Sequence, residues 1–257
     1  MNRGELNELL VKLKLVELRD RKQVITISGK SLAINSVSFN NREFRPLPPG
    51  TVLSNLSESR VESLAYSIGA SKAGLFDKAD VFINGKGYSM KSLATAPPAL
   101  VNHTNRFGWE RVCQSLNKSI SELDTIIDEY WRRRKAGLIR EDVINDRNSP
   151  FYSHKEYMIP ILNYFLFKGS GSKDSNAPAD FILDIVDPLN SRTWSIHGQE
   201  FLEENWENLV FCVRAKKGMS DYPAILDKKK KDSIARWTQF HQGEYRGALH
   251  VRFKNGK

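Results

Sequence analysis

Apolar residues recur at two spacings along this chain, and each spacing predicts one kind of secondary structure. Apolar side chains that return every three or four residues predict helices, at residues 5–19, 57–70, 107–116, 123–135 and 154–167. Short runs rich in β-branched and aromatic residues predict strands, at residues 24–27, 32–39, 79–84, 87–94, 181–186, 193–197, 209–215 and 248–253. This order predicts an α/β (α+β) fold, with a partly antiparallel, mixed central sheet flanked by helices.

Glycine and proline mark the connections between these elements. Gly29-Lys30 and Gly85-Lys86 each lie between two predicted strands, as the loop of a β-hairpin does. Residues 45–50 hold three prolines and a glycine and predict the main break in the chain. We therefore expect an N-terminal appendage of a helix and a hairpin over residues 1–50, and a main body over residues 51–257.

The charge is concentrated near the C-terminus. The 257 residues include 39 Lys and Arg and 30 Asp and Glu, for a net charge of +9. From Arg214 onward there are 12 basic and 4 acidic side chains, whereas the first 213 residues hold 27 and 26. A nearly neutral body with a basic C-terminal segment indicates a polyanionic partner.

Several classes of protein are excluded by composition. Two cysteines, Cys113 and Cys212, in apolar surroundings fit neither a disulfide scaffold nor a four-cysteine zinc site. The histidines lack the spacing of a zinc enzyme. There is no apolar run long enough to span a membrane, and the first 20 residues lack the apolar core of a signal peptide. We expect a cytoplasmic protein with no membrane partner.

The predicted hairpin over residues 79–94 carries the most informative chemistry. With Gly85-Lys86 as its loop, Asp80 lies opposite Lys91, and Ser89 shares their face of the sheet. A two-residue shift would set Asp80 opposite Ser89 and keep all three on that face. A carboxylate can bind Mg²⁺, and an ammonium beside it can activate a water or neutralise a phosphate. The alternative is a cross-strand ion pair on a solvated face.

Asp80 on one strand and Ser89-Met90-Lys91 on the next resemble the active-site hairpin of the PD-(D/E)XK nucleases, over about residues 55–95. The size and terminal elaboration are similar to those of type II restriction endonucleases. Ala79 and Ser89 stand where that family has a proline and an acidic residue. The resemblance implies a restriction-endonuclease-like fold, Mg²⁺ held by Asp80 and the Met90 carbonyl, and Lys91 activating the attacking water.

Members of the family with Ser at the position of Ser89 place the missing carboxylate on a nearby helix. Glu62 is our preferred candidate, because the family often carries a glutamate on the helix before the hairpin. Its alternative role is a capping box with Ser59. Glu110, on the helix after the hairpin, is the second candidate, and its alternative is an ordinary solvated position.

A second predicted hairpin, residues 178–197, also has an aspartate on its first strand, but it has no lysine in the corresponding place. We interpret it as structural or as an aid to DNA binding.

Three segments are rich in groups that could bind DNA. The candidates are Asn102, His103, Asn105 and Arg106 in a loop after the hairpin; Lys168, Ser170, Ser172 and Lys173 in a second loop; and Lys228, Lys229, Lys230, Lys231, Arg236, Gln239, His241 and Gln242 in the basic segment. Lysines, hydroxyls and exposed N–H groups suit phosphates, whereas Arg and Gln can also read bases. Each segment could equally be an ordinary solvated surface.

Together these features predict a Mg²⁺-dependent type II site-specific deoxyribonuclease that cuts double-stranded DNA. Cutting two strands favours a homodimer, since a two-fold site matches a two-fold protein. Two alternatives stay open: a DNA-binding protein without catalysis, and a repair or RNA-processing nuclease of the same superfamily.

Overall fold

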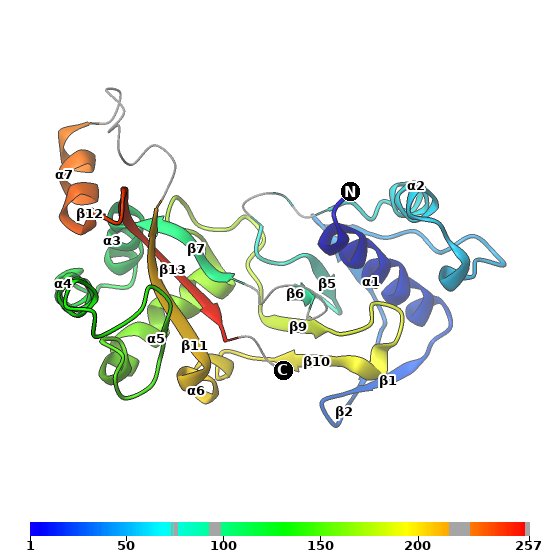
Figure 1. Ribbon diagram of the computed structural model, residues 1–257. Coiled ribbons are helices and arrows are strands. Elements are labelled where there is room, and N and C mark those ends of the chain that lie inside the picture. Colours follow the sequence, from blue (N-terminus) through cyan, green and yellow to red (C-terminus); the bar gives the residue numbers. More distant parts are fainter. Residues whose placement is uncertain (73, 75–76, 93–98, 216–226, 255–257) are drawn as a thin grey trace. The chain divides into compact units, whose positions relative to one another are not determined.

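The computed structural model describes residues 1–72, 74, 77–92, 99–215 and 227–254 (Figure 1). The chain divides into two compact units, and each is built from two stretches of sequence. Unit 1 comprises Met1–Ala96 and Ser175–Glu200, and unit 2 comprises Pro97–Asp174 and Phe201–Lys257. Both units contain helices and sheets, so the predicted mixed class is confirmed.

Unit 1 is mainly strands. Its elements are α1 (Arg3–Asp20), β1 (Val24–Ile27), β2 (Lys30–Ala33), β3 (Val37–Phe39), β4 (Arg42–Glu43), the 3₁₀ turn η1 (Leu53–Asn55), α2 (Glu58–Ile68), β5 (Val81–Ile83), β6 (Lys86–Ser92), β9 (Phe181–Ile185), the 3₁₀ turn η4 (Ser191–Thr193) and β10 (Trp194–His197). The main sheet has the order β10-β9-β6-β5-β3-β4. In that sheet β6 and β9 run parallel, and the other described neighbours run antiparallel.

Helix α1 is an integral part of unit 1. Asn2 and Glu5 close its N-terminus with a capping box, which satisfies N–H groups that the first turn leaves free. Its side chains are buried around most of its circumference, and it packs on β3, β6 and α2. Residues that we expected to form an N-terminal appendage therefore belong to the same unit as the β5–β6 hairpin.

The β5–β6 hairpin turns one residue earlier than expected. Ile83 pairs with Lys86, so the loop is Asn84-Gly85 rather than Gly85-Lys86. Both loop residues have positive φ, 51° and 76°, as a two-residue hairpin turn with the twist of its strands requires. The Asn84 side chain also accepts the N–H groups of Asn35 and Ser36.

Unit 2 pairs a second sheet with several helices. Its elements are β7 (Ala99–Asn105), α3 (Arg106–Ser115), α4 (Ser121–Lys135), β8 (Val143–Ile144), the 3₁₀ turn η2 (Tyr152–His154), α5 (Lys155–Asn163), the π-helical turn η3 (Tyr164–Lys168), α6 (Phe201–Glu204), the 3₁₀ turn η5 (Trp206–Asn208), β11 (Leu209–Ala215), α7 (Lys228–Trp237), β12 (Gln239–His241) and β13 (Glu244–Phe253). The sheet has the order β12-β13-β11-β8, and β7 also pairs with β13.

One face of the unit 2 sheet packs on helices. Phe211 of β11 stacks on Phe151, and the Val213 N–H donates to the hydroxyl of Tyr130 on α4. In Figure 1 helix α5 passes behind β11 and β13. The side chains at alternate positions of β11, beginning with Val210, therefore face away from these contacts.

Candidate functional site

Asp80 lies at the entry to β5 and is bound to β6. Its N–H donates to the Tyr88 carbonyl (2.8 Å), and its Oδ2 accepts the N–H of Met90 (2.6 Å). Val81 pairs with Tyr88, so the next step of this register sets Asp80 beside Ser89. The register with Asp80 opposite Lys91 is therefore wrong, because the loop is Asn84-Gly85, and the two-residue alternative applies.

The environment of Asp80 disfavours its ionised form. Burial raises the pKa of Asp80 to about 6, the negative charge of Glu8 contributes, and Lys91, Lys12 and the Met90 N–H oppose the rise. A carboxylate with a raised pKa is stabilised in its ionised form by a nearby cation. Perturbed groups of this kind concentrate at functional sites.

Lys78 is a basic neighbour that the sequence did not single out. Burial lowers the pKa of Lys78 to about 8, the positive charge of Lys91 lowers it further, and Asp80 opposes both. The charges of Lys91 and Asp80 therefore both act on the pKa of Lys78. Ser89, which lies between Lys78 and Lys91 in the sequence, is buried in β6.

The second carboxylate near Asp80 comes from α1. Glu8 forms an ion pair with Lys12 (2.6 Å), and the fully buried Lys12 ammonium also donates to the Ser71 carbonyl (2.7 Å). Asn7, the preceding residue, donates to the Ser92 hydroxyl at the end of β6 (3.0 Å). These contacts fix the helix turn that carries Glu8 against the strand that carries Lys91.

The two glutamates favoured from the sequence lie elsewhere. Glu62 is an exposed residue of α2. The N-cap of that helix is Ser57, which makes no side-chain cap hydrogen bond, and Ser59 lies inside the helix, so the capping box of Ser59 with Glu62 is not formed either. Glu110 belongs to unit 2, where it accepts hydrogen bonds from Arg106 (3.2 Å) and Ser233 (2.8 Å). The helix whose carboxylate acts on the pKa of Asp80 is α1, through Glu8.

The second predicted hairpin lies next to β6 in the same sheet. Lys91 pairs with Asp184 across the parallel β6–β9 ladder, so their side chains share a face. Asp184 Oδ2 lies 3.2 Å from His197 Nε2 on β10. Asp180 has a structural role, because its Oδ2 accepts the Gly87 N–H (2.8 Å). Sequence alone could not reveal the proximity of Asp184 to Lys91, since it arises from strand pairing.

The residues around Asp80 suit a Mg²⁺ ion. Mg²⁺ keeps several waters and is commonly bound through one or two carboxylates. Asp80 and Glu8 would supply that number of hard oxygen ligands, and the half-buried Asp80 would gain a compensating charge. A cluster of three or more His, Cys, Asp or Glu that could hold a metal is absent from the described residues.

The predicted DNA-binding loop after the hairpin is not a loop. Asn102, His103 and Asn105 lie in β7, which pairs with β13, and the Asn105 side chain caps α3 by accepting the Gly108 N–H (3.2 Å). Arg106 begins α3 and is bound by Asp124 (2.7 Å). The expected loop was therefore wrong: the segment is a strand, and Asn105 and Arg106 bind at its junction with α3.

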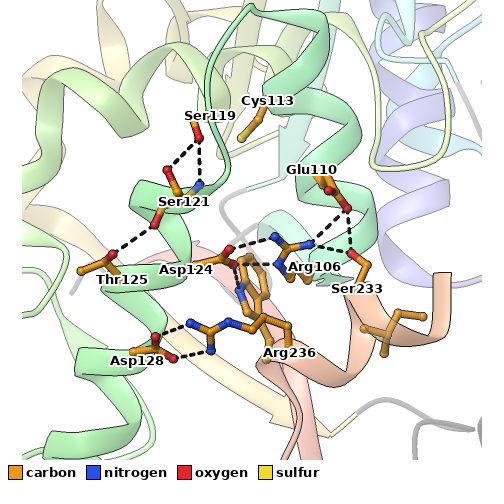
Figure 2. A network of polar contacts seen from close by, with 12 residues as sticks. Arg106, Glu110, Cys113, Ser119, Ser121, Asp124, Thr125, Asp128, Ser233 and Arg236 are labelled. Carbon is orange, nitrogen blue, oxygen red and sulfur yellow. Dashed lines mark hydrogen bonds and ion pairs between the residues drawn. The ribbon is translucent and has the colours of Figure 1, made fainter. Parts of the chain in front are cut away.

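Figure 2 shows the network that holds Arg106 and joins α3, α4 and α7. Asp124 accepts both Arg106 and the indole N–H of Trp237 (2.6 Å). Arg236, predicted to read bases, forms an ion pair with Asp128 one turn further along α4. These arginines therefore connect helices within unit 2.

The loop around residues 168–174 is closed by its own hydrogen bonds. Arg111 donates to the carbonyls of Ser170 and Gly171, and the Ser170 hydroxyl accepts the N–H groups of Ser172 and Lys173. Those N–H groups were expected to face phosphates. Lys168 is exposed at the edge of this loop.

The basic segment folds as α7 followed by β12. Asp227 caps α7 by accepting the Lys230 N–H (2.8 Å). Gln239 accepts from Lys135 (2.9 Å), Gln242 accepts from Arg134 (3.2 Å), and the His241 ring lies against Trp131. Lys228 and Lys229 are exposed, Lys231 is partly exposed, and Lys230 lies over the Phe107 ring. The lysines are thus better placed than the glutamines to meet a polyanion.

Comparisons with protein families, with curated proteins and with solved structures find no match to this chain. Within the part of the chain that the structure describes, no helix combines the length and apolar character needed to cross a bilayer.

Proposed function

We propose that this chain is a Mg²⁺-dependent, site-specific endonuclease of double-stranded DNA with a restriction-endonuclease-like unit 1. The observation that carries the proposal is the position of Asp80, half-buried and bound to β6 at Met90, within the electrostatic reach of Lys91 and Glu8. The helix α1 on a mixed sheet, with β6 between β5 and β9, supports it further.

Each residue would have one task. Asp80 and Glu8 would hold Mg²⁺, which when bound supplies positive charge to the phosphate and acidifies a water. Lys91 would hold the attacking water and favour loss of its proton. The water oxygen would bond to phosphorus as its proton passes to solvent. The bond from phosphorus to the 3′ oxygen would break as that oxygen takes a proton from solvent, and the products would be a 3′ hydroxyl and a 5′ phosphate.

The decisive experiment is DNA cleavage with and without Mg²⁺. Phage DNA should give discrete fragments with Mg²⁺ and stay intact with EDTA. We expect Lys91→Ala to lower the cleavage rate by at least about 100-fold, in the range of lost acid–base catalysis. Lys86→Ala is the matched control, because Lys86 begins the same strand and is exposed, and it should cut at the normal rate.

Other results would point elsewhere. A smear of fragments would support a repair or processing nuclease, and retarded but intact DNA would support a binding protein without catalysis. Cleavage by Lys91→Ala at the rate of the unaltered chain would show that Lys91 is not part of the active site.

A further inference from the structure

A broad depression lies on the face of the unit 2 sheet opposite to Phe211. Its volume is about 810 Å³. Four cationic and two acidic side chains take part in its lining, with two aliphatic ones: Arg140, Glu141, Asp142, Ile144, Val210, Arg214, Arg252 and Lys254. Positive charge therefore exceeds negative charge on this surface by two.

Strand pairing sets two arginines on this face. Val210 pairs with Arg252, and Arg214 lies four residues beyond Val210 on β11, which returns it to the same side. Their side chains are 33% and 21% exposed, so both guanidinium groups reach solvent. Two arginines on adjacent strands form a rigid pair of forked donors, which suits phosphate oxygens.

Asp142 holds the two arginines in place. It accepts from Arg214 (3.2 Å) and from Arg252 (2.9 Å). Each guanidinium has five N–H donors; Arg214 Nε also donates to Cys212 Sγ (2.9 Å), and Arg252 also donates to the Phe253 carbonyl (3.1 Å). Glu141, the other acidic residue of the lining, forms an ion pair with Arg246 (2.6 Å).

A buried histidine lies on the same face. His250 pairs with Cys212, between Val210 and Arg214, and only 6% of it is exposed. Its Nδ1 has no hydrogen-bond partner in the described structure. Burial lowers the pKa of His250 to about 4, and the positive charge of Arg214 contributes. The His250 ring lies edge-on against the His103 ring (5.0 Å between centroids), and its Nδ1 would gain a hydrogen bond from a bridging water on a bound phosphate.

We propose that this face, defined by Arg140, Arg214, Arg252 and Lys254, binds the phosphate backbone of duplex DNA. Charge complementarity supports this occupant, because unit 2 carries 24 basic and 17 acidic side chains, whereas unit 1 carries 15 and 13. The identity of the polymer as DNA rests on the proposed function, whereas the location of the surface rests on unit 2 alone.

The test measures binding of a random-sequence DNA duplex by fluorescence anisotropy, with the full-length Lys91→Ala chain in EDTA. Arg214→Gln/Arg252→Gln should weaken binding at least about tenfold and make the salt dependence shallower, because two phosphate contacts are lost. Arg132→Gln/Arg133→Gln is the control, since it removes the same charge from α4, where both arginines pair with Glu129. It should change affinity less than about twofold.

A second variant tests the surface in the opposite direction. Asp142→Asn removes the carboxylate that Arg214 and Arg252 share, and it should strengthen binding several-fold. A misfolded protein would not bind more tightly, so this result separates the proposal from a loss of structure. Equal affinity in the double glutamine variant and its control, or no gain in Asp142→Asn, would overturn it.

Two further readouts complete the design. Polyglutamate that binds as tightly as DNA, with the same dependence on Arg214 and Arg252, would identify an acidic protein as the partner and reject the proposal. Unaffected binding in the arginine variant, together with normal cleavage when the same two substitutions are made in the chain that keeps Lys91, would reject only this surface. Arginine-dependent binding without any Mg²⁺-dependent cleavage would reject only the proposed catalysis.

Discussion

Asp80 is a half-buried carboxylate whose ionisation opposes folding, and this lowers the stability of the folded chain at neutral pH. Its pKa of about 6 in the folded chain lies above the ordinary value of 3.8. Folding therefore favours the protonated form of Asp80. The contribution of this preference to the free energy of unfolding is full below about pH 4 and is lost as the pH rises through about 6. At pH 7 and above the unaltered chain lacks this contribution.

We expect Asp80→Asn to stabilise the chain at about pH 8 by about 3 kcal/mol, and to have little effect at about pH 4. Urea unfolding in EDTA at the two pH values measures this difference. Glu62→Gln is the control, because it removes an exposed carboxylate from the same unit. A gain for Asp80→Asn that is the same at both pH values would show that burial does not control its ionisation.

The same residue should link Mg²⁺ to stability. A ligand that binds the folded chain raises its melting temperature. We expect Mg²⁺ at about pH 8 to raise the melting temperature of the unaltered chain and of Glu62→Gln, but not that of Asp80→Asn or Glu8→Gln. If Glu62→Gln lost the Mg²⁺ effect and Glu8→Gln kept it, the second carboxylate would be Glu62 after all.

At the scale of elements, two ion pairs on one helix of unit 2 differ in how far they are buried. Asp124 and Asp128 lie one turn apart on α4 and bind arginines on α3 and α7 (Figure 2). The Asp124 side chain is 15% exposed and that of Asp128 is 52% exposed. Burial raises the pKa of Asp124, but hydrogen bonds from Arg106 and Trp237 outweigh it, and the pKa is lowered.

Asp124→Asn should therefore lower the free energy of unfolding by about 2–4 kcal/mol, because the partly buried guanidinium of Arg106 loses the negative charge of its carboxylate partner Asp124. Asp128→Asn should cost below about 1 kcal/mol, as exposed ion pairs do. Urea unfolding followed by tryptophan fluorescence compares the two, since Trp109, Trp131, Trp206 and Trp237 lie in unit 2. Similar losses would mean that burial does not separate these pairs.

Elements with strong local patterns could be predicted, and those made by tertiary pairing could not. The apolar periodicity of α1 and α4 placed both helices to within two residues. Strand β7 contains Asn102, His103 and Thr104, and this polar sequence predicts a loop. The segment is a strand because it pairs with β13. Helix α7 begins with four lysines, and this run of charge gives no helical apolar pattern. Its buried face, formed by Ser233, Ile234 and Trp237, therefore could not be predicted.

The candidate site shows the same division. Asp80 and Lys91 could be found because a hairpin brings them together within a dozen residues. Glu8 comes from the first helix, and Asp184 comes from a strand that returns to unit 1 after the chain has passed through unit 2. Neither has a local pattern that distinguishes it from a solvated charge, so only the packing of α1 and the β6–β9 ladder reveals them.

At the scale of the whole molecule, the chain crosses between its two units three times, yet each unit has its own buried residues. Leu183 is fully buried in β9, between β6 and β10 of unit 1, and Leu249 is fully buried in β13 of unit 2. Each leucine therefore reports on the core of a single unit. Replacing a buried leucine by alanine costs about 2–5 kcal/mol, through lost burial and a residual cavity.

If each unit opens as its own cooperative segment, local destabilisation stays within it. Leu183→Ala should then accelerate hydrogen exchange of the amides in β5, β6 and β10 by at least about tenfold, while those in β11 and β13 keep their protection. Leu249→Ala is the matched variant and should give the reverse pattern. Accelerated exchange in both sheets from either variant would show that the two units unfold together, and that the site on β6 depends on the integrity of the whole chain.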